Sequence, residues 1–316
     1  MTAPRPTLAA REAAAFGKVI LLGEHAVVHG VPALAAGLPR ALVLRARPLD
    51  DPRGPTELSI PAWDVRVQLA PGDDGAMHPV ARAAAEVLAL CDAPLAGLRI
   101  DGETTLPAGA GLGSSAALCV ALARLALGPG APAEEVVEAS MAGERVFHGS
   151  PSGIDSEIAA RGGVLRFVRG RPPEPIRPAR PLPLVILPTG VPRRTADLVA
   201  HVGRFVRREP AVARPILEAI RGCVERGQAA LEVGDHATLG RMFDACHGLL
   251  SALGVGHRRL DDLCAVARSA GALGAKLTGA GGGGCAIALA GDDPHRVAAA
   301  AATAGCTAIV TEIATA

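Results

Sequence analysis

PAGAGLGSSAALCVALARLAL, residues 107–127, opens with alternating glycines and two serines and continues as an apolar run. Serines suit the first turn of a helix and Gly128-Pro129 suits its end, so the pattern predicts a helix beginning near Ser114. Only Arg124 interrupts its apolar surface, and a helix that is apolar on all sides is expected to be buried. Its amino end would present backbone N–H groups and the positive end of the helix dipole, an arrangement that binds phosphate.

Two other interpretations fit this glycine loop. A glycine-rich turn before a helix can be purely structural. Gly111, Gly113 and Ala116 also match a loose dinucleotide-binding pattern, G-x-G-x-x-A. A Walker loop is excluded, because no Gly-Lys-Ser/Thr follows. Other parts of the sequence must therefore decide among a turn, a phosphate loop and a dinucleotide loop.

Length and composition narrow the class of protein. The 316 residues can build a large core and two domains. The 32 basic and 31 acidic side chains nearly cancel and aromatic residues make up 2%, which argues against nucleic acid and membrane surfaces as partners. No apolar span approaches about 18 residues, and we find no signal peptide. The seven cysteines form no C-x-x-C pair, so we expect a reduced, cytoplasmic protein.

Charged side chains follow an apolar run near the start of the chain. Residues 18–22 (KVILL) predict a buried strand, after a lead-in that we expect to be partly frayed. Glu24 and His25 follow directly at the end of this strand, and strand ends are positions where functional groups collect. A snorkelling lysine and a solvent loop would account for the same residues. Lys18 and Lys276 are the only lysines among many arginines, which hints at a need for a compact point charge.

Two carboxylates fall in helices that we expect after the glycine-loop helix. A helix over 132–148 places Glu144 on a face with core residues, where a carboxylate needs an arginine or a metal ion as partner. Arg145 is not the obvious partner, because it points about 100° away around the helix. A second helix is expected from Ser150 as cap and Pro151 as first residue. Asp155 then lies in the first turn, where a capping carboxylate is the simpler interpretation.

The remaining pattern predicts strands and helices without internal repeats. In the first part we expect strands at 41–47, 58–60, 65–69, 98–104 and 163–168 and a helix at 78–90. In the second part we expect strands at 184–187, 285–290 and 307–313 and helices at 195–207, 211–231, 237–250, 258–269 and 294–304. Residues 171–183 hold six prolines in thirteen positions, so we place a domain boundary there, giving domains 1–178 and 179–316.

Three separated motifs together resemble those of the GHMP kinases. They are GKVILLGEHAVVHG (17–30), PAGAGLGSSAA (107–117) and KLTGAGGGGCAIAL (276–289), which are similar to the first, second and third motifs of that family. Three further segments are similar to the members that phosphorylate mevalonate. They are GERVFHGSPSGID (143–155), VPRRTADLV (191–199) and LSALGVGHRRLDDLC (250–264). One glycine motif is weak evidence, but three in order with GEHAVV and HGxPSGxD are very specific.

The resemblance implies a two-domain α+β fold. Its N-terminal domain would be ribosomal-protein-like and its C-terminal domain ferredoxin-like, with the active site in the cleft between them. It implies ATP and Mg²⁺ as cofactors and mevalonate as the small-molecule substrate. The activity would be phosphorylation of the 5-hydroxyl of mevalonate to 5-phosphomevalonate, with release of ADP, in isoprenoid precursor synthesis. A homodimer is left open.

The resemblance also assigns roles to residues. The nucleotide phosphates would be bound by Pro107, Gly109, Ala110, Gly111, Leu112, Gly113, Ser114, Ser115 and Ala116. Ser115 and Glu144 would hold Mg²⁺. Asp155 would orient or deprotonate the substrate hydroxyl, with Lys18 beside it. The substrate would be contacted by Lys18, Glu24, His25, Asp155, Thr195 and Gly281. We interpret the remaining candidates His29, His148 and His257 as structural or loop histidines.

Several residues depart from the family pattern. These are Phe16, Ser150, Ser156, Gly190 and Arg194, which we place around the substrate side. Another GHMP kinase, acting on phosphomevalonate, galactose or homoserine, is therefore an alternative. An oxidoreductase using Gly111 and Gly113 would leave Lys18, Glu144 and Asp155 without a role. A non-catalytic metabolite sensor would be expected to lack a catalytic group.

Overall fold

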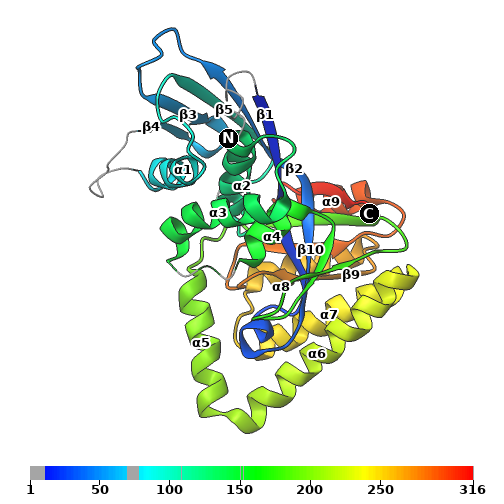
Figure 1. Ribbon diagram of the computed structural model, residues 1–316. Coiled ribbons are helices and arrows are strands. Elements are labelled where there is room, and N and C mark those ends of the chain that lie inside the picture. Colours follow the sequence, from blue (N-terminus) through cyan, green and yellow to red (C-terminus); the bar gives the residue numbers. More distant parts are fainter. Residues whose placement is uncertain (1–10, 70–77, 108, 150, 152, 316) are drawn as a thin grey trace. The chain divides into compact units, whose positions relative to one another are not determined.

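The helix expected after the glycine loop is α2, Ser114–Leu127, and ten of its fourteen residues are buried. It packs against α1 (Pro79–Leu90), α3 (Ala133–His148) and α4 (Ile154–Arg161), which lie beside it in Figure 1. The computed structural model describes residues 11–69, 78–107, 109–149, 151 and 153–315. The all-round apolar pattern therefore predicted both the helix and its burial correctly.

Small residues let these helices approach one another closely. Gly143 of α3 faces α2, and a Cβ there would lie 2.5 Å from Cys119 Sγ and 2.9 Å from Val87 of α1. Glycine inside a helix costs roughly 1 kcal/mol relative to alanine. Its presence at this position is explained by the lack of room for a side chain.

Contacts divide the chain into two compact units. Unit 1 comprises residues 1–17, 39–108 and 112–162, and unit 2 comprises 18–38, 109–111 and 163–316. The two long strands β1 (Arg11–Leu22) and β2 (Ala33–Pro48) each contribute residues to both units. The units therefore interleave along the chain. The family boundary that we placed at residues 178 and 179 stays a prediction.

The strands of unit 1 pack on these helices. β3 (Thr56–Ile60) pairs antiparallel with β4 (Val65–Leu69) and parallel with β5 (Leu98–Thr104), which pairs antiparallel with the second half of β2. A short 3₁₀ turn, Pro61–Trp63, links β3 to β4. Alternate strand residues point into the core, which they share with α1 and α2.

Unit 2 contains a four-stranded antiparallel sheet in the order β11-β8-β10-β9. Its strands are β8 (Leu182–Pro188), β9 (Gly274–Thr278), β10 (Cys285–Leu289) and β11 (Ile309–Ile313). The first part of β2 pairs with β6 (Val164–Phe167), which pairs with β7 (Glu174–Ile176). β7 and β9 are not among the strands that we predicted. β7 lies in the proline-rich stretch, and the glycines after β9 obscure its end.

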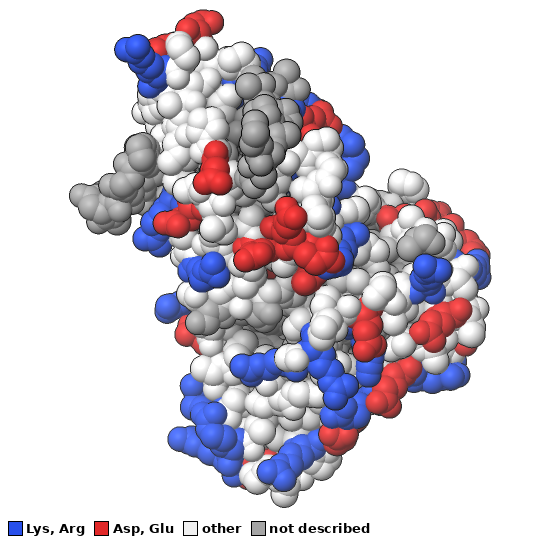
Figure 2. All heavy atoms as spheres, viewed as in Figure 1, with Lys and Arg blue, Asp and Glu red and all other residues white. Residues whose placement is uncertain are grey.

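The helices of unit 2 match the predicted ones within a few residues. They are α5 (Thr195–Arg208), α6 (Pro210–Val233), α7 (His236–Ala252), α8 (Arg258–Ser269) and α9 (Pro294–Thr303). α5 buries only Val202. Its arginines contribute to the basic side chains that gather over this helix at the lower left of Figure 2.

Strand β1 begins at Arg11 rather than at residue 18, so the expectation of a frayed lead-in is wrong for residues 11–17. Alanine has a low strand propensity, which hid this segment from sequence analysis. In the folded protein Ala13 and Ala15 are buried, and Arg11 donates to the carbonyl of Leu125 at 3.0 Å. Burial and a side-chain anchor thus outweigh intrinsic propensity here.

Helix α4 begins at Ile154, and Gly153 is its cap. The expected start at Pro151 is therefore wrong, and the expected cap, Ser150, lies outside the described residues. Gly153 has φ 83°, a left-handed conformation that does not continue a right-handed helix. The same start still places Asp155 in the first turn, as predicted.

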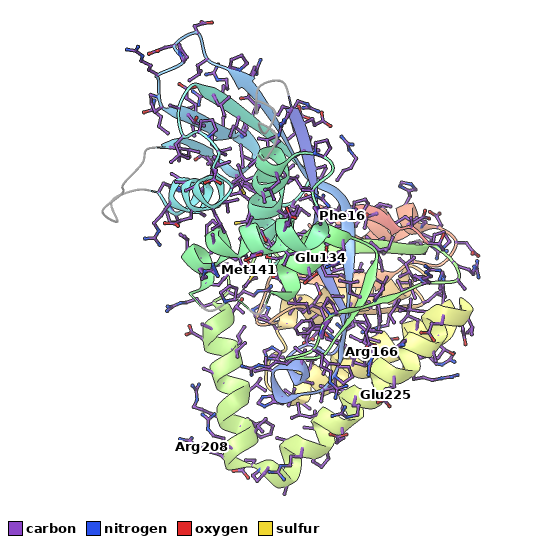
Figure 3. The ribbon with its side chains drawn as sticks, viewed as in Figure 1. Phe16, Glu134, Met141, Arg166, Arg208 and Glu225 are labelled. Carbon is purple, nitrogen blue, oxygen red and sulfur yellow. The ribbon has the colours of Figure 1, made fainter. Side chains whose placement is uncertain are left out.

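Phe16, one of the departures noted above, has a packing role. Its ring lies against Gly162, where a Cβ would be 2.5 Å from the ring, and both residues belong to unit 1 (Figure 3). Gly162 has φ 67° and follows the last residue of α4. The aromatic ring therefore fills space beside the end of α4.

The topology contradicts a dinucleotide-binding fold. Such a fold needs a parallel strand after the glycine-loop helix. Here α2 is followed by α3 and α4, and the next strand, β6, pairs antiparallel with β2. Within the described part of the chain, no helix is both long and apolar enough to cross a bilayer.

Candidate active site

The loop before α2 is shaped by glycines in left-handed conformations. Gly109, Gly111 and Gly113 have φ of 67°, 78° and 77°. Gly113 occupies the cap position of α2, which has no side-chain cap hydrogen bond. The first N–H groups of a helix have no acceptor within the helix. Leu112 and Ala116 are buried, so only their backbone is suited to meeting a ligand.

Ser115 and Glu144 lie around one histidine in unit 1. Ser115 Oγ is 3.2 Å from His148 Nε2, and Glu144 Oε2 is 3.9 Å from the same nitrogen. Glu144 is buried, whereas the His148 side chain is 54% exposed. The structure thus brings the two predicted metal ligands together. We had interpreted His148 as structural, although its position four residues after Glu144 puts both on one helix face.

Asp155 lies in the first turn of α4 and is half-buried. The amino end of a helix carries a partial positive charge, so an acidic side chain in the first turn stabilises the helix. Glu157 on the same helix pairs with Arg161 at 2.7 Å and belongs to an ion-pair network that also includes Glu134.

In unit 2, the first and third sequence motifs are tied together by a buried ion pair. Glu24 and Lys276 are 1% and 0% exposed, and Lys276 Nζ donates to Glu24 Oε1 and to the carbonyl of Leu277 at 2.6 Å. Burial raises the pKa of Glu24, and the Lys276 charge opposes that rise. Glu24 Oε2 has no hydrogen-bond partner among the described residues. A carboxylate oxygen thus remains for a ligand group.

His25 is the second link between these motifs. Its Nε2 lies 2.9 Å from the carbonyl oxygen of Ala280, so Nε2 carries a proton and donates. Burial lowers the pKa of His25, which favours the neutral ring with an accepting Nδ1. Thr278 adds a third link, because its Oγ1 accepts from the N–H of Ile20 at 3.0 Å and donates to the carbonyl of Ile20 at 2.9 Å.

The other predicted site residues of unit 2 have varied surroundings. Lys18 is 8% exposed, on β1. Thr195 is exposed and is the first residue of α5. Gly281 is buried with φ 72°, and a Cβ there would overlap the carbonyl of Val255. Gly281 is therefore suited to a backbone role only.

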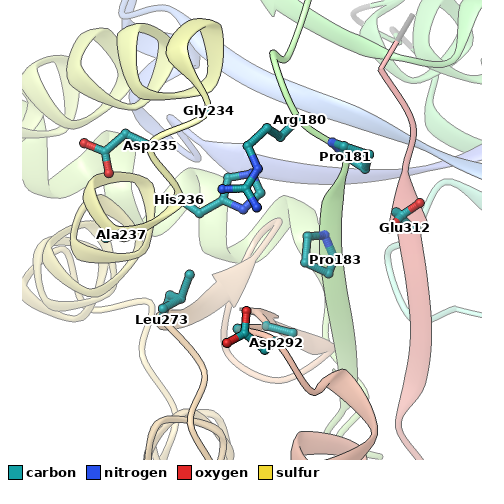
Figure 4. Close-up of a pocket in the computed structure, with 12 residues that line it drawn as sticks. Arg180, Pro181, Pro183, Gly234, Asp235, His236, Ala237, Leu273, Asp292 and Glu312 are labelled. Atoms are coloured by element: carbon teal, nitrogen blue, oxygen red, sulfur yellow. The ribbon is translucent and has the colours of Figure 1, made fainter.

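A different pocket of unit 2 lies among residues that the motifs do not include (Figure 4). Arg180 and His236 occupy its centre, with Asp235, Asp292 and Glu312 around them. No residue that we predicted for the site lines this pocket. Its mixed charges give no preference for an anionic or a cationic ligand.

Comparisons with known proteins identify the family. Residues 79–163 match the family GHMP kinases N terminal domain, and residues 228–306 match GHMP kinases C terminal. A mevalonate kinase from Thermococcus gammatolerans is 38% identical, with 95% of each chain covered. One from Aeropyrum pernix is also 38% identical, over 89% of this chain and 88% of the relative.

A solved structure gives the same result. The crystal structure of L. major mevalonate kinase in complex with R-mevalonate superimposes with a TM-score of 0.85 at 29% identity, covering 100% of this chain and 99% of that one. The chain therefore belongs to the GHMP kinase family, and the expected two-domain α+β fold is confirmed. Within that family it groups with the mevalonate kinases.

Proposed function

We propose that this chain transfers the terminal phosphoryl group of ATP to the 5-hydroxyl of mevalonate, giving 5-phosphomevalonate and ADP. The observation that carries the proposal is the 38% identity to mevalonate kinases over 95% of the chain. The site geometry adds support, because Ser115 and Glu144 converge on one nitrogen beside the amino end of α2. The relatives reported above are named mevalonate kinases, which favours mevalonate over the alternative substrates galactose, homoserine and phosphomevalonate.

We assign phosphate binding to the glycine loop. Residues 109, 111 and 113 have positive φ values, a backbone conformation that residues with side chains rarely adopt. The N–H groups at the start of α2 and the dipole of this buried helix favour a polyphosphate there. Ser114, Ser115 and Ala116 form the first turn.

The residues at this site fit a magnesium ion. Mg²⁺ prefers hard oxygen ligands and retains several waters, so one hydroxyl and one carboxylate suffice. Ser115 Oγ and Glu144 Oε2 would supply them, and both lie near His148 Nε2. This set has a single carboxylate, and the described residues contain no cluster of three or more acidic, histidine or cysteine side chains that could hold a metal ion. When bound, Mg²⁺ would offset the charge of the phosphates.

Asp155 and Lys18 are our proposed catalytic pair. Phosphoryl transfer depends on positioning the hydroxyl and on balancing charge. Asp155 would accept a hydrogen bond or a proton from the 5-hydroxyl of the substrate. The Lys18 ammonium would lower the pKa of that hydroxyl and stabilise the developing negative charge.

The acid substrate would be recognised by Glu24, His25, Thr195 and the backbone of Gly281. In its neutral form, His25 presents an accepting Nδ1, because its Nε2–H is engaged by Ala280. We therefore assign His25 to a substrate hydroxyl and leave the carboxylate to backbone N–H groups and to Thr195. Glu24 Oε2 would accept from a second donor.

A panel of alcohols tests this proposal. Mevalonate should be phosphorylated with ATP and Mg²⁺, and phosphomevalonate, galactose and homoserine should be poor substrates. Asp155→Asn and Lys18→Met should lower turnover by roughly 10²- to 10⁴-fold while ATP affinity stays nearly normal. Glu157→Gln, on the same helix as Asp155, is the matched control and should retain activity. Strong turnover of another alcohol with none of mevalonate would overturn the proposal.

We place the reaction in the cytoplasm. All seven cysteines are unpaired and buried, as a reducing compartment allows. A homodimer stays a prediction.

A further inference from the structure

Arg193 lies between two glycine loops of unit 2. A Cβ on Gly111, in the loop before α2, would overlap the Arg193 guanidinium, and so would a Cβ on Gly284, in the third motif. A Cβ on Gly279 would lie 3.1 Å from Nη2 of the same side chain. The Arg193 side chain therefore fits here because these three positions are glycine.

The guanidinium has few partners for its charge. Nη1 donates to the carbonyl of Gly283 at 3.1 Å and more weakly to that of Thr278 at 3.5 Å. Among the described residues, Nη2 has no hydrogen-bond acceptor and no carboxylate lies within ion-pair distance of Arg193. The neighbouring Arg194 differs, because it is exposed and lies 3.5 Å from Asp197.

Burial makes this arrangement unfavourable without an anion. Desolvation lowers the pKa of Arg193, and its charge helps to lower the pKa of the nearby His25. A partly buried cation is stabilised by a hydrogen-bonded anion rather than by carbonyl groups alone. The planar fork of a guanidinium suits phosphate oxygens, which accept two N–H groups at once.

We propose that Arg193 binds the polyphosphate of the nucleotide, joining the loop at Gly111 to the loop at residues 279–284. The inference rests on the proposed function, since ATP is the ligand in question. The nucleotide is favoured over the acid substrate because the guanidinium touches Gly111, which lies two residues before the cap of α2. Nη2, which points toward Gly111 and Gly279, would donate to a phosphate oxygen.

Nucleotide affinity measured by calorimetry tests this role. We compare AMP-PNP and AMP, each with Mg²⁺, and mevalonate, on the wild type and on Arg193→Gln, Arg193→Lys and Arg204→Gln, an exposed position on α5. Arg193→Gln should weaken AMP-PNP binding roughly 10- to 100-fold, the loss expected for one charged hydrogen bond. AMP and mevalonate affinities should change less than about 3-fold, because they lack the β- and γ-phosphates. Arg193→Lys should be intermediate, and Arg204→Gln should match the wild type.

Other outcomes overturn the inference. Weaker mevalonate binding with normal AMP-PNP binding would assign the cation to the acid substrate. Equal weakening of every ligand, with a lower melting temperature, would mean that Arg193 only holds the third-motif loop through Gly283. Failure of the proposed function is distinguishable, because a wild type that binds AMP-PNP but does not phosphorylate mevalonate still permits the Arg193 comparison.

Discussion

Lys276 illustrates how a single residue can be informative. Lys276 Nζ is enclosed by Glu24 and the carbonyl of Leu277, with the Phe243 ring centroid at 5.9 Å. A compact ammonium fits this fully buried space, whereas a planar guanidinium with five donors would leave several unsatisfied. The rarity of lysine in the sequence thus has a physical explanation at this position. Lys276 and Glu24 lie 252 residues apart in sequence, so no local pattern revealed this pair.

The proposed metal site at Ser115 and Glu144, beside His148, gives a prediction about the magnesium requirement of the enzyme. Ser115→Ala and Glu144→Gln should each raise the Mg²⁺ concentration needed for half-maximal activity by about 10-fold or more, since even outer-shell partners cost 10- to 100-fold. Titrating Mg²⁺ against initial rate, with Mg²⁺-dependent protection against thermal unfolding as a second readout, measures this. Glu138→Gln, an exposed position on the same helix, is the control. An unchanged metal requirement would remove the mutated residue from the metal site.

At the scale of elements, helices were predicted better than short strands. A period of 3.6 residues sustained over three or more turns is a strong signal, and α5 to α9 all appear close to their expected bounds. β7 has only three residues, and all five residues of β9 are buried, so neither shows a clear alternation. The alanines of β1 and the left-handed Gly153 before α4 were overlooked because tertiary packing, not propensity, decides both boundaries.

Helix packing in unit 1 gives a prediction for stability. Gly143→Ala should destabilise the protein by about 1–3 kcal/mol, because its Cβ would meet Cys119 and Val87 in a filled core. Gly222→Ala is the matched control inside α6, where a Cβ meets nothing within 4 Å. That control should stabilise by about 0.5–1 kcal/mol through helix propensity. Urea unfolding of both variants measures the difference, and equal effects would show that α3 can move away from α2.

For the whole molecule, the sequence predicted the family correctly. Motif order identified the family, and Ser115 and Glu144 indeed lie together. The proline-rich stretch suggested one linear boundary, yet the compact units interleave, because β1 and β2 each contribute to both. Arg193 lies in the segment VPRRTADLV, and the resemblance assigns it no role. Its importance depends on glycines far away in sequence, which become neighbours only on folding.

Stability of the whole chain should depend on pH through the buried His25 and His247 and the half-buried His236. The pKa values of His25, His236 and His247 are lowered from 6.5, chiefly by burial. The unfolded chain therefore binds protons first as pH falls below about 6.5, which favours unfolding. The free energy of unfolding should be highest above that pH and should decrease on acidification until each folded-state pKa is reached. Each site contributes at most about 1.4 kcal/mol per pH unit.

His236 provides the sharpest test of this pH dependence. Its Nε2 is buried with no partner among the described residues, and the Arg180 charge further disfavours protonation, while Asp235 opposes both effects. His236→Gln should reduce the loss of stability between pH 7.5 and 5.5, measured by urea unfolding at several pH values. His295→Gln, at an exposed position on α9, should leave that slope unchanged. Parallel slopes for the wild type and His236→Gln would show that His236 takes up its proton equally well in the folded and unfolded states.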